Sequence, residues 1–351
     1  MNEGICDLSL IRKDILDVIA KITRVSDSIT KSYLAEHMPE SIDFMDLARR
    51  VHVSNMEFLI ERKEPTVSIT PEELVFAAEL ERFTSDQLSD LVPDLRVAAD
   101  VVIESTTYES IACEWQRTPN ASKDAILMYL HGGGFYHGSP KSHRRLSSEI
   151  GRSADVSVVS VDYRLTPEYA YPAALEDAFN VYTSLLDEGY DPAKMFIGGD
   201  SAGGYLTLTT LLKIRDEGLQ MPAGGVCISP ITDLTMSFEP SFENAKTDIV
   251  VAPTGVYWIM KLFLRDADPS LDSVSPLFAN LENLPPLLFQ ASEIELLYYD
   301  SERFVHKARE AGVSVTFQTW KDTVHVFHWL NLPEAKDAIE KIGVFIKEMI
   351  R

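Results

Sequence analysis

Residues 195–208 read MFIGGDSAGGYLTL and join a short apolar run to a turn that is rich in glycine. Within this segment Gly199, Ser201 and Gly203 fit the pattern G-x-S-x-G. In that pattern a serine occupies a sharp turn from a strand to a helix, where small neighbours avoid clashes and the turn pushes the hydroxyl group out of the sheet. The segment therefore predicts a buried strand, an outward-pointing serine hydroxyl, and a helix whose N-terminus favours negative charge at the same place.

A second glycine cluster lies upstream, in residues 126–139 with the sequence ILMYLHGGGFYHGS. Gly132, Gly133 and Gly134 follow a run of apolar residues and carry no side chains, so any function at this point belongs to the backbone. Glycine adopts positive φ readily and lets the main chain approach another group closely. Two functions compete for such a run: a cradle for phosphate, or a set of N–H donors directed at a developing negative charge.

The order of the predicted elements indicates the fold class. After about residue 95, short β-branched runs alternate with helical stretches near residues 142–153, 173–188 and 205–217. Strands that alternate with helices form a mostly parallel sheet covered on both faces, and ligands bind beyond the carboxyl ends of its strands. Both glycine clusters follow such strands. The earlier residues instead show the three- and four-residue apolar spacing of helices, at Ile11, Ile15, Val18, Ile22, Val25 and Ile29.

Composition and charge are those of a globular protein and argue against nucleic-acid-binding, membrane and disulfide-rich proteins. The chain has 351 residues, of which 45% are hydrophobic and 25% charged, the balance of an ordinary globular protein. Its net charge of −22 would repel nucleic acid and anionic membranes, and its apolar runs are too short for a bilayer span. The N-terminus lacks the pattern of a secretory signal, and the 3 cysteines fit neither a disulfide framework nor a zinc site. We therefore expect a cytoplasmic protein with reduced thiols that binds neither nucleic acid nor membrane.

Acidic and histidine residues follow two further predicted strands. A serine hydroxyl becomes a good nucleophile only beside a base that a third group orients, and in this kind of fold the order along the chain is serine, acid, histidine. Glu293 and Glu295 come directly after the run PPLLFQAS. His325 and His328 come after the run VSVTFQTW. The order and the placement after strands both favour nucleophilic catalysis by Ser201.

Four segments resemble the hormone-sensitive-lipase-like esterases, which are bacterial family IV of the α/β-hydrolase superfamily. They are HGGGF at residues 131–135, DYRLTPEYAYPAALED at 162–177, GDSAGG at 199–204 and SPLFANLENLPPLLFQAS at 275–292. The likeness covers about residues 125–327. It implies an α/β-hydrolase fold with a mostly parallel central sheet flanked by helices. It also implies an N-terminal helical cap over residues 1–95 and a catalytic domain over residues 96–351.

The resemblance further implies a second cap segment at about residues 236–272. This segment carries apolar residues at helical spacing, which either line an acyl pocket or pack against the core, the commoner role of such spacing. The residues concerned are Trp258, Met260, Phe263 and Leu264.

Carried over to this sequence, the resemblance makes Ser201 the nucleophile and His325 the general base and acid. The backbone N–H groups of Gly133, Gly134 and Ala202 would form the oxyanion hole. The glycine run then serves an oxyanion and not a phosphate. In agreement, the sequence has no G-K-[ST] triplet, which a P-loop requires. The pattern G-x-G-x-x-G counted from residue 132 also fails, because residue 137 is histidine and not glycine.

The acidic member of the triad departs from the family pattern, which often has Asp-Pro-Leu. Here the register places Glu295 at the aspartate position, with leucine in place of the proline. Glutamate holds the imidazole tautomer and stabilises imidazolium as aspartate does, and some members of the family resemble this chain in using it. Glu293 and Asp300 are the alternative acids, and His328 is the alternative to His325 as the base.

Supporting roles are expected for other residues of the two motifs. We expect His131 to shape the oxyanion loop through hydrogen bonds, and Asp200 to have a structural role in the serine turn. His131, His137 and His143 recur at six-residue steps, but this spacing matches no common zinc pattern. We therefore expect no metal and no cofactor, with His137 and His143 structural or lining the pocket.

The resemblance implies hydrolysis of carboxylic esters with short acyl chains through an acyl-enzyme, with a small-molecule acyl ester as the binding partner. Two other activities stay open: hydrolysis of amides, as in a deacetylase, and lipase action at an oil–water interface. A ligand receptor on the same scaffold is a third alternative, although such receptors typically lose the catalytic histidine and His325 is present. The oligomeric state is also open, and a homodimer formed by pairing of edge strands is common among similar enzymes.

Overall fold

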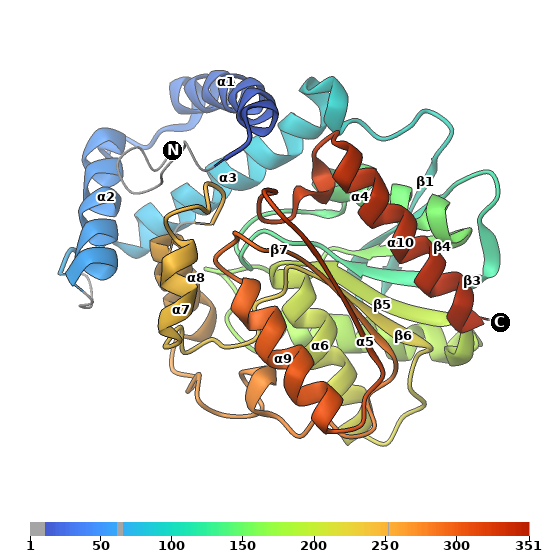
Figure 1. The fold of residues 1–351 in the computed structure, drawn as a ribbon. Helices are drawn as coiled ribbons and strands as arrows, with labels where there is room; N and C mark the ends of the chain where they lie inside the picture. Colours follow the sequence, from blue (N-terminus) through green and yellow to red (C-terminus); the bar gives the residue numbers. More distant parts are fainter. Residues whose placement is uncertain (1–10, 62–65, 252, 351) are drawn as a thin grey trace.

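The computed structural model describes residues 11–61, 66–251 and 253–350 (Figure 1). In this part of the chain eight strands form one sheet in the order β1-β2-β4-β3-β5-β6-β7-β8, and β2 runs antiparallel to the other seven. The strands are β1 (Val102–Tyr108), β2 (Ile111–Arg117), β3 (Ser122–Leu130), β4 (Val156–Val161), β5 (Met195–Asp200), β6 (Gly224–Ile228), β7 (Leu287–Ser292) and β8 (Val315–Trp320). The predicted α/β fold with a mostly parallel sheet is confirmed.

Helices cover both faces of the sheet. They are α1 (Lys13–His37), α2 (Phe44–Glu61), α3 (Pro71–Leu91), α4 (Pro140–Ala154), α5 (Ala173–Asp187), α6 (Ala202–Asp216), α7 (Glu239–Asn244), α8 (Pro253–Leu264), α9 (Tyr298–Glu310) and α10 (Pro333–Ile350). α4 and α10 share a core with one face, and α5, α6 and α9 with the other. Three of them confirm the helices predicted near residues 142–153, 173–188 and 205–217. Within the described ranges, no helix has both the length and the apolar character that a membrane span needs.

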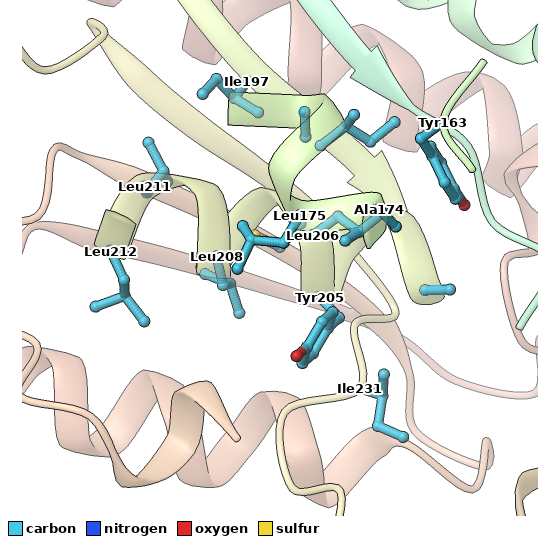
Figure 2. Packing of buried hydrophobic residues seen from close by; sticks show 14 of the residues in the cluster. Tyr163, Ala174, Leu175, Ile197, Tyr205, Leu206, Leu208, Leu211, Leu212 and Ile231 are labelled. Carbon is cyan, nitrogen blue, oxygen red and sulfur yellow. The ribbon is translucent and has the colours of Figure 1, made fainter. Parts of the chain in front are cut away.

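Side chains of the central strands alternate between the two layers, as the two-residue period of a strand requires. In β3, Ile126, Met128 and Leu130 join the core with α5 and α6, whereas Leu127 and Tyr129 join the core with α4 and α10. All five side chains are buried, and each contributes about 1.5–3 kcal/mol through burial of apolar surface. Figure 2 shows part of the layer that α5 and α6 form with β5. The sheet is therefore a rigid platform for the loops at its carboxyl edge.

The first three helices form a small core of their own and also reach the loops of the sheet. A capping box starts α3, in which the side chain of Thr70 accepts from the N–H of Glu73 and the Glu73 carboxylate accepts from the N–H of Thr70. At the start of α1, Ile15 packs in one cluster with Val324 and Phe327. Figure 1 shows these helices on the same side of the molecule as α7 and α8. Their own core consists of Tyr33, Ile42, Leu47, Phe76 and Leu80.

Candidate active site

Ser201 occupies the turn between β5 and α6 in a strained backbone conformation. Its φ of 52° and ψ of −115° are rare for a residue with a side chain, and its N–H donates to the backbone oxygen of Ile228 at 2.8 Å. A Cβ atom on Gly199 or Gly203 would collide with the backbone oxygen of Leu130. The two glycines therefore let the turn pack against β3, and Ser201 lies half-buried at the N-terminus of α6 and lines a cavity.

Three backbone N–H groups line the same cavity as this serine without an acceptor among the described residues. Gly133 and Gly134 have φ values of 111° and 58°, and a Cβ on Gly133 would collide with the backbone oxygen of His137. In the described part of the chain, no protein acceptor receives the N–H of Gly133, Gly134 or Ala202. All three residues line the cavity that Ser201 also lines. Such free donors suit the stabilisation of a developing oxyanion.

His325 and Glu295 form a buried pair at the same cavity. Nδ1 of His325 lies 3.2 Å from Oε2 of Glu295, which also accepts from the Ser229 hydroxyl at 2.8 Å. With a proton on Nδ1, this contact is a hydrogen bond and leaves Nε2 as the basic nitrogen. Burial alone would lower the pKa of His325, but Glu295, with smaller contributions from the charges of Asp248 and Asp200, raises that pKa above its ordinary value. Burial in turn raises the pKa of Glu295.

The alternative acids and the alternative base make other contacts. Glu293 accepts from the hydroxyl of Thr319 at 2.9 Å, and Asp300 accepts from two backbone N–H groups at 2.7 and 2.8 Å. His328 is fully buried with Nε2 2.9 Å from Oε1 of Gln290, and burial lowers its pKa to about 3. The structure thus brings His325 together with Glu295, and not with Glu293 or Asp300.

Asp248 is a buried carboxylate near this pair that no sequence motif predicts. It accepts from the N–H of Leu296 at 2.8 Å and from the N–H groups of Val250 and Val251 at 2.9 Å. Burial raises the pKa of Asp248, and these hydrogen bonds and His325 act against that rise. The carboxylate therefore ties the loop after Glu295 to two residues of the cavity wall. No local pattern reveals this role, because the partner lies 48 positions away.

Asp200 supports the glycine run from beneath the serine turn. Its Oδ1 accepts from the Tyr129 hydroxyl at 2.7 Å and from the N–H of Gly132 at 3.1 Å. Nε2 of His143 lies 3.5 Å from its Oδ2. Burial alone would raise the pKa of Asp200, but His143 and Tyr129 outweigh it and bring that pKa down to about 2. Asp200 thus has a structural role, since its carboxylate links the serine turn to the glycine run at residues 132–134.

His131 is buried and holds the same loop through its ring. Its Nδ1 lies 2.7 Å from the backbone oxygen of Gly132, and its ring stacks on Tyr163 with centroids 4.2 Å apart. Burial lowers the pKa of His131 to about 3, so the imidazole is neutral. His137 and His143 line the cavity, and burial likewise lowers the pKa of His137 to about 4. No group of three histidine, cysteine, aspartate or glutamate residues within the described ranges has metal-binding geometry.

Side chains of α3 fasten the far end of the glycine loop. Arg82 donates to the backbone oxygen of Tyr136 at 2.8 Å and to that of Thr166 at 2.6 Å, and it pairs with Glu168 at 2.7 Å. Oγ of Ser85 lies 3.2 Å from Nδ1 of His137. The sequence alone does not predict the contact of Arg82 with Tyr136, because no local pattern connects an arginine in the first helices with a loop 54 positions later.

The cavity has a volume of about 490 Å³ and lies between the N-terminal helices and the loops of the sheet. Ser201 and His325 line it together with residues of α1, α3 and α8. Of the four apolar residues considered for an acyl pocket, Met260 lines the cavity. Phe263 instead stacks on Phe135 with ring centroids 3.8 Å apart. Phe263 therefore packs against the core, which is one of the two roles that its helical spacing predicts.

A serine on a strand–helix turn at the carboxyl edge of a mostly parallel sheet defines the class of α/β-hydrolases. A family model described as the alpha/beta hydrolase fold matches residues 127–329. An acetyl-hydrolase from Streptomyces hygroscopicus is 36% identical to this chain, over 77% of this chain and 89% of its own length.

Two solved structures are also similar to this chain. EstE5 soaked with p-nitrophenyl butyrate has 35% identity and a TM-score of 0.75, covering 86% of this chain and 98% of its own. An esterase of the bacterial hormone-sensitive lipase family has 34% identity and a TM-score of 0.75, covering 88% of this chain and 100% of its own. The chain belongs to the hormone-sensitive-lipase-like carboxylesterases of the α/β-hydrolase superfamily, as its sequence motifs predict.

Proposed function

We propose that this carboxylesterase hydrolyses small-molecule esters of short acyl chains through Ser201, His325 and Glu295. The main support is that one cavity is lined by a strained serine, by a histidine that a buried glutamate contacts, and by three N–H donors without an acceptor among the described residues. A receptor that only binds its ligand would not need this combination of features. Nucleophilic catalysis needs all of them.

Acylation begins with neutral His325. Its Nε2 takes the proton of the Ser201 hydroxyl as Oγ attacks the ester carbonyl carbon, and the electrons of the C=O bond move to its oxygen. The N–H groups of Gly133, Gly134 and Ala202 stabilise this oxyanion, each by about 3 kcal/mol. Glu295 accepts from Nδ1–H throughout, so it fixes the tautomer and stabilises the imidazolium that forms.

Collapse of the tetrahedral intermediate breaks the bond to the alcohol oxygen. His325 gives its proton to this leaving group, and the acyl group stays on Ser201. In the second half, His325 takes a proton from water, the hydroxide attacks the acyl carbon, and the carboxylic acid leaves as Ser201 regains its proton. Because His325 must start neutral and its pKa is raised, activity should fall as the pH drops through that raised pKa.

Two observations support short acyl chains. The cavity of about 490 Å³ lies in the lower half of the usual range for ligand pockets, about 300–1,000 Å³, and must hold both halves of the ester. A relative is named for acetyl hydrolysis, and a similar structure was soaked with p-nitrophenyl butyrate. Both names fit small acyl groups.

The test compares hydrolysis of p-nitrophenyl acetate, butyrate and palmitate by wild type, Ser201→Ala and Ser237→Ala. Ser237 is an exposed serine outside the cavity and controls for the loss of a hydroxyl group. We expect wild type and Ser237→Ala to hydrolyse acetate and butyrate well, and Ser201→Ala to hydrolyse neither. Turnover of palmitate alone would overturn the short-chain proposal, and equal rates in all three proteins would exclude Ser201 as the nucleophile. Turnover of p-nitroanilides in preference to esters would favour an amide hydrolase.

A further inference from the structure

One face of α3 lines the cavity beside the glycine loop. Residues 81, 84, 85, 88 and 89 all line it and recur at three- and four-residue steps, so a single face of the helix is turned toward the cavity. Tyr136 lines the same cavity as Glu81, and burial together with the negative charge of Glu81 raises the pKa of its hydroxyl group. A Cβ on Gly134 would lie 3.1 Å from an edge carbon of Tyr136. Glu81 thus lies on the wall that adjoins the proposed oxyanion hole.

Glu81 differs from the other charged residues of this wall. Among the described residues that line the cavity, Glu81, Arg145 and Asp200 carry a formal charge at neutral pH. Arg145 pairs with Glu149 at 3.1 Å, and Asp200 accepts from the Tyr129 hydroxyl at 2.7 Å. The Glu81 side chain is exposed, and it has neither a hydrogen bond nor an ion pair with any residue that the structure describes. Its charge is therefore available to a ligand.

No described residue supplies a countercharge in contact with Glu81. The side chain is exposed where it lines the cavity, and the surrounding walls partly desolvate its carboxyl group and raise its pKa. Thr84, one turn further along the same face, is buried and its hydroxyl also has no partner among the described residues. Apolar side chains of Ile19 and Ile22 on α1 line the cavity as well. A carboxylate in such a place gains more from a cation than one in open water does.

We propose that Glu81 is a specificity-determining residue that selects esters carrying a positively charged ammonium group. The cation would occupy the side of the cavity formed by α1 and α3, within reach of the Glu81 carboxylate. An anionic substituent there would be repelled, and a neutral apolar one would leave the carboxylate unpaired. This inference rests on the proposed ester hydrolysis and names its substrate class. The net charge of −22 would also draw cationic substrates toward the protein.

The test uses pairs of esters that share a shape and differ by one charge. The butyrate ester of choline is compared with its neutral isostere, in which carbon replaces the nitrogen, to place the charge in the alcohol. The p-nitrophenyl ester of ω-trimethylammonio-hexanoate and its carbon isostere place the charge in the acyl group. The ratio of kcat/KM for the cationic and the neutral ester is measured in wild type, Glu81→Gln and Glu79→Gln. Glu79 is an exposed acid on the same helix that does not line the cavity, so it is the matched control.

In at least one pair, we expect Glu81→Gln to lower the ratio about threefold to fivefold and Glu79→Gln to leave it unchanged. An unchanged ratio in both pairs, or an equal fall in Glu79→Gln, would overturn the proposal while the neutral esters still report ester hydrolysis. If no ester were hydrolysed, the proposed function would fail separately. Binding of hexyltrimethylammonium ion, measured by calorimetry, would then decide: about fivefold weaker binding in Glu81→Gln supports the role of Glu81, and equal binding overturns it.

Discussion

The carboxyl edge of the sheet and the N-terminal helices meet at one cavity but are built differently. At the sheet edge, functional groups are buried and held by several partners, as Asp200 and Glu295 illustrate. The helices reach the cavity mainly through exposed or half-buried side chains, such as Glu81 and Ser85. The difference suggests that the sheet determines the chemistry and the helices determine which substrates reach it. Substitutions at the sheet edge should therefore mainly change the rate of the chemical steps, and substitutions in the helices should mainly change substrate preference.

The largest effect is expected for Ser201→Ala. Removal of the attacking hydroxyl should lower kcat for p-nitrophenyl butyrate by at least about 10⁴-fold, since the remaining donors cannot form an acyl-enzyme. Steady-state kinetics measures this loss, and circular dichroism checks that the fold persists. A residual rate within tenfold of wild type would contradict the assignment.

Glu295→Gln should lower kcat about 10³-fold or more. The amide cannot stabilise the imidazolium and allows the wrong tautomer of His325, although the shape is kept. Glu293→Gln is the matched control, because Glu293 contacts Thr319 and not His325. Comparable losses in the two variants would mean that the wrong glutamate has been assigned.

Arg82→Ala tests the contact between the two regions. Loss of its hydrogen bond to Tyr136 should loosen the glycine loop and lower kcat about tenfold to a hundredfold. The free energy of unfolding should fall by about 1–2 kcal/mol, because two backbone oxygens lose a charged donor. Arg49→Ala removes an arginine from an exposed ion pair on α2 and should change neither quantity. An Arg82→Ala enzyme with full kcat would show that the loop holds its geometry without α3.

The smallest effect is expected for Asp248→Asn, which should appear in the pH profile. Glu295, together with the charge of Asp248, raises the pKa of His325, so loss of the Asp248 charge should lower that pKa. Because activity requires neutral His325, the acid limb of kcat/KM should then move to lower pH. A limb that stays in place or moves to higher pH would show that Asp248 acts on the position of the loop alone.

The sequence predicts the residues of the sheet edge better than those of the helices, for a physical reason. Ser201 and the glycines belong to contiguous motifs, whose backbone geometry depends on their own small residues. Asp248 and Arg82 act on residues 48 and 54 positions away, so only the folded chain reveals their roles. The start of α6 illustrates the same limit. The helix begins at Ala202, three residues before the predicted Tyr205, and its first turn contains Gly203 and Gly204, whose low helix propensity conceals it in the sequence.

The most direct test of the account is to locate the acyl group during turnover. Wild type is mixed with p-nitrophenyl butyrate, quenched in acid within milliseconds, digested and analysed by mass spectrometry. Nucleophilic catalysis by Ser201 predicts one butyryl group on the peptide that contains Ser201, and no butyryl peptide from Ser201→Ala under the same conditions. A butyryl group on another residue, or rapid turnover with no acylated peptide at all, would contradict it.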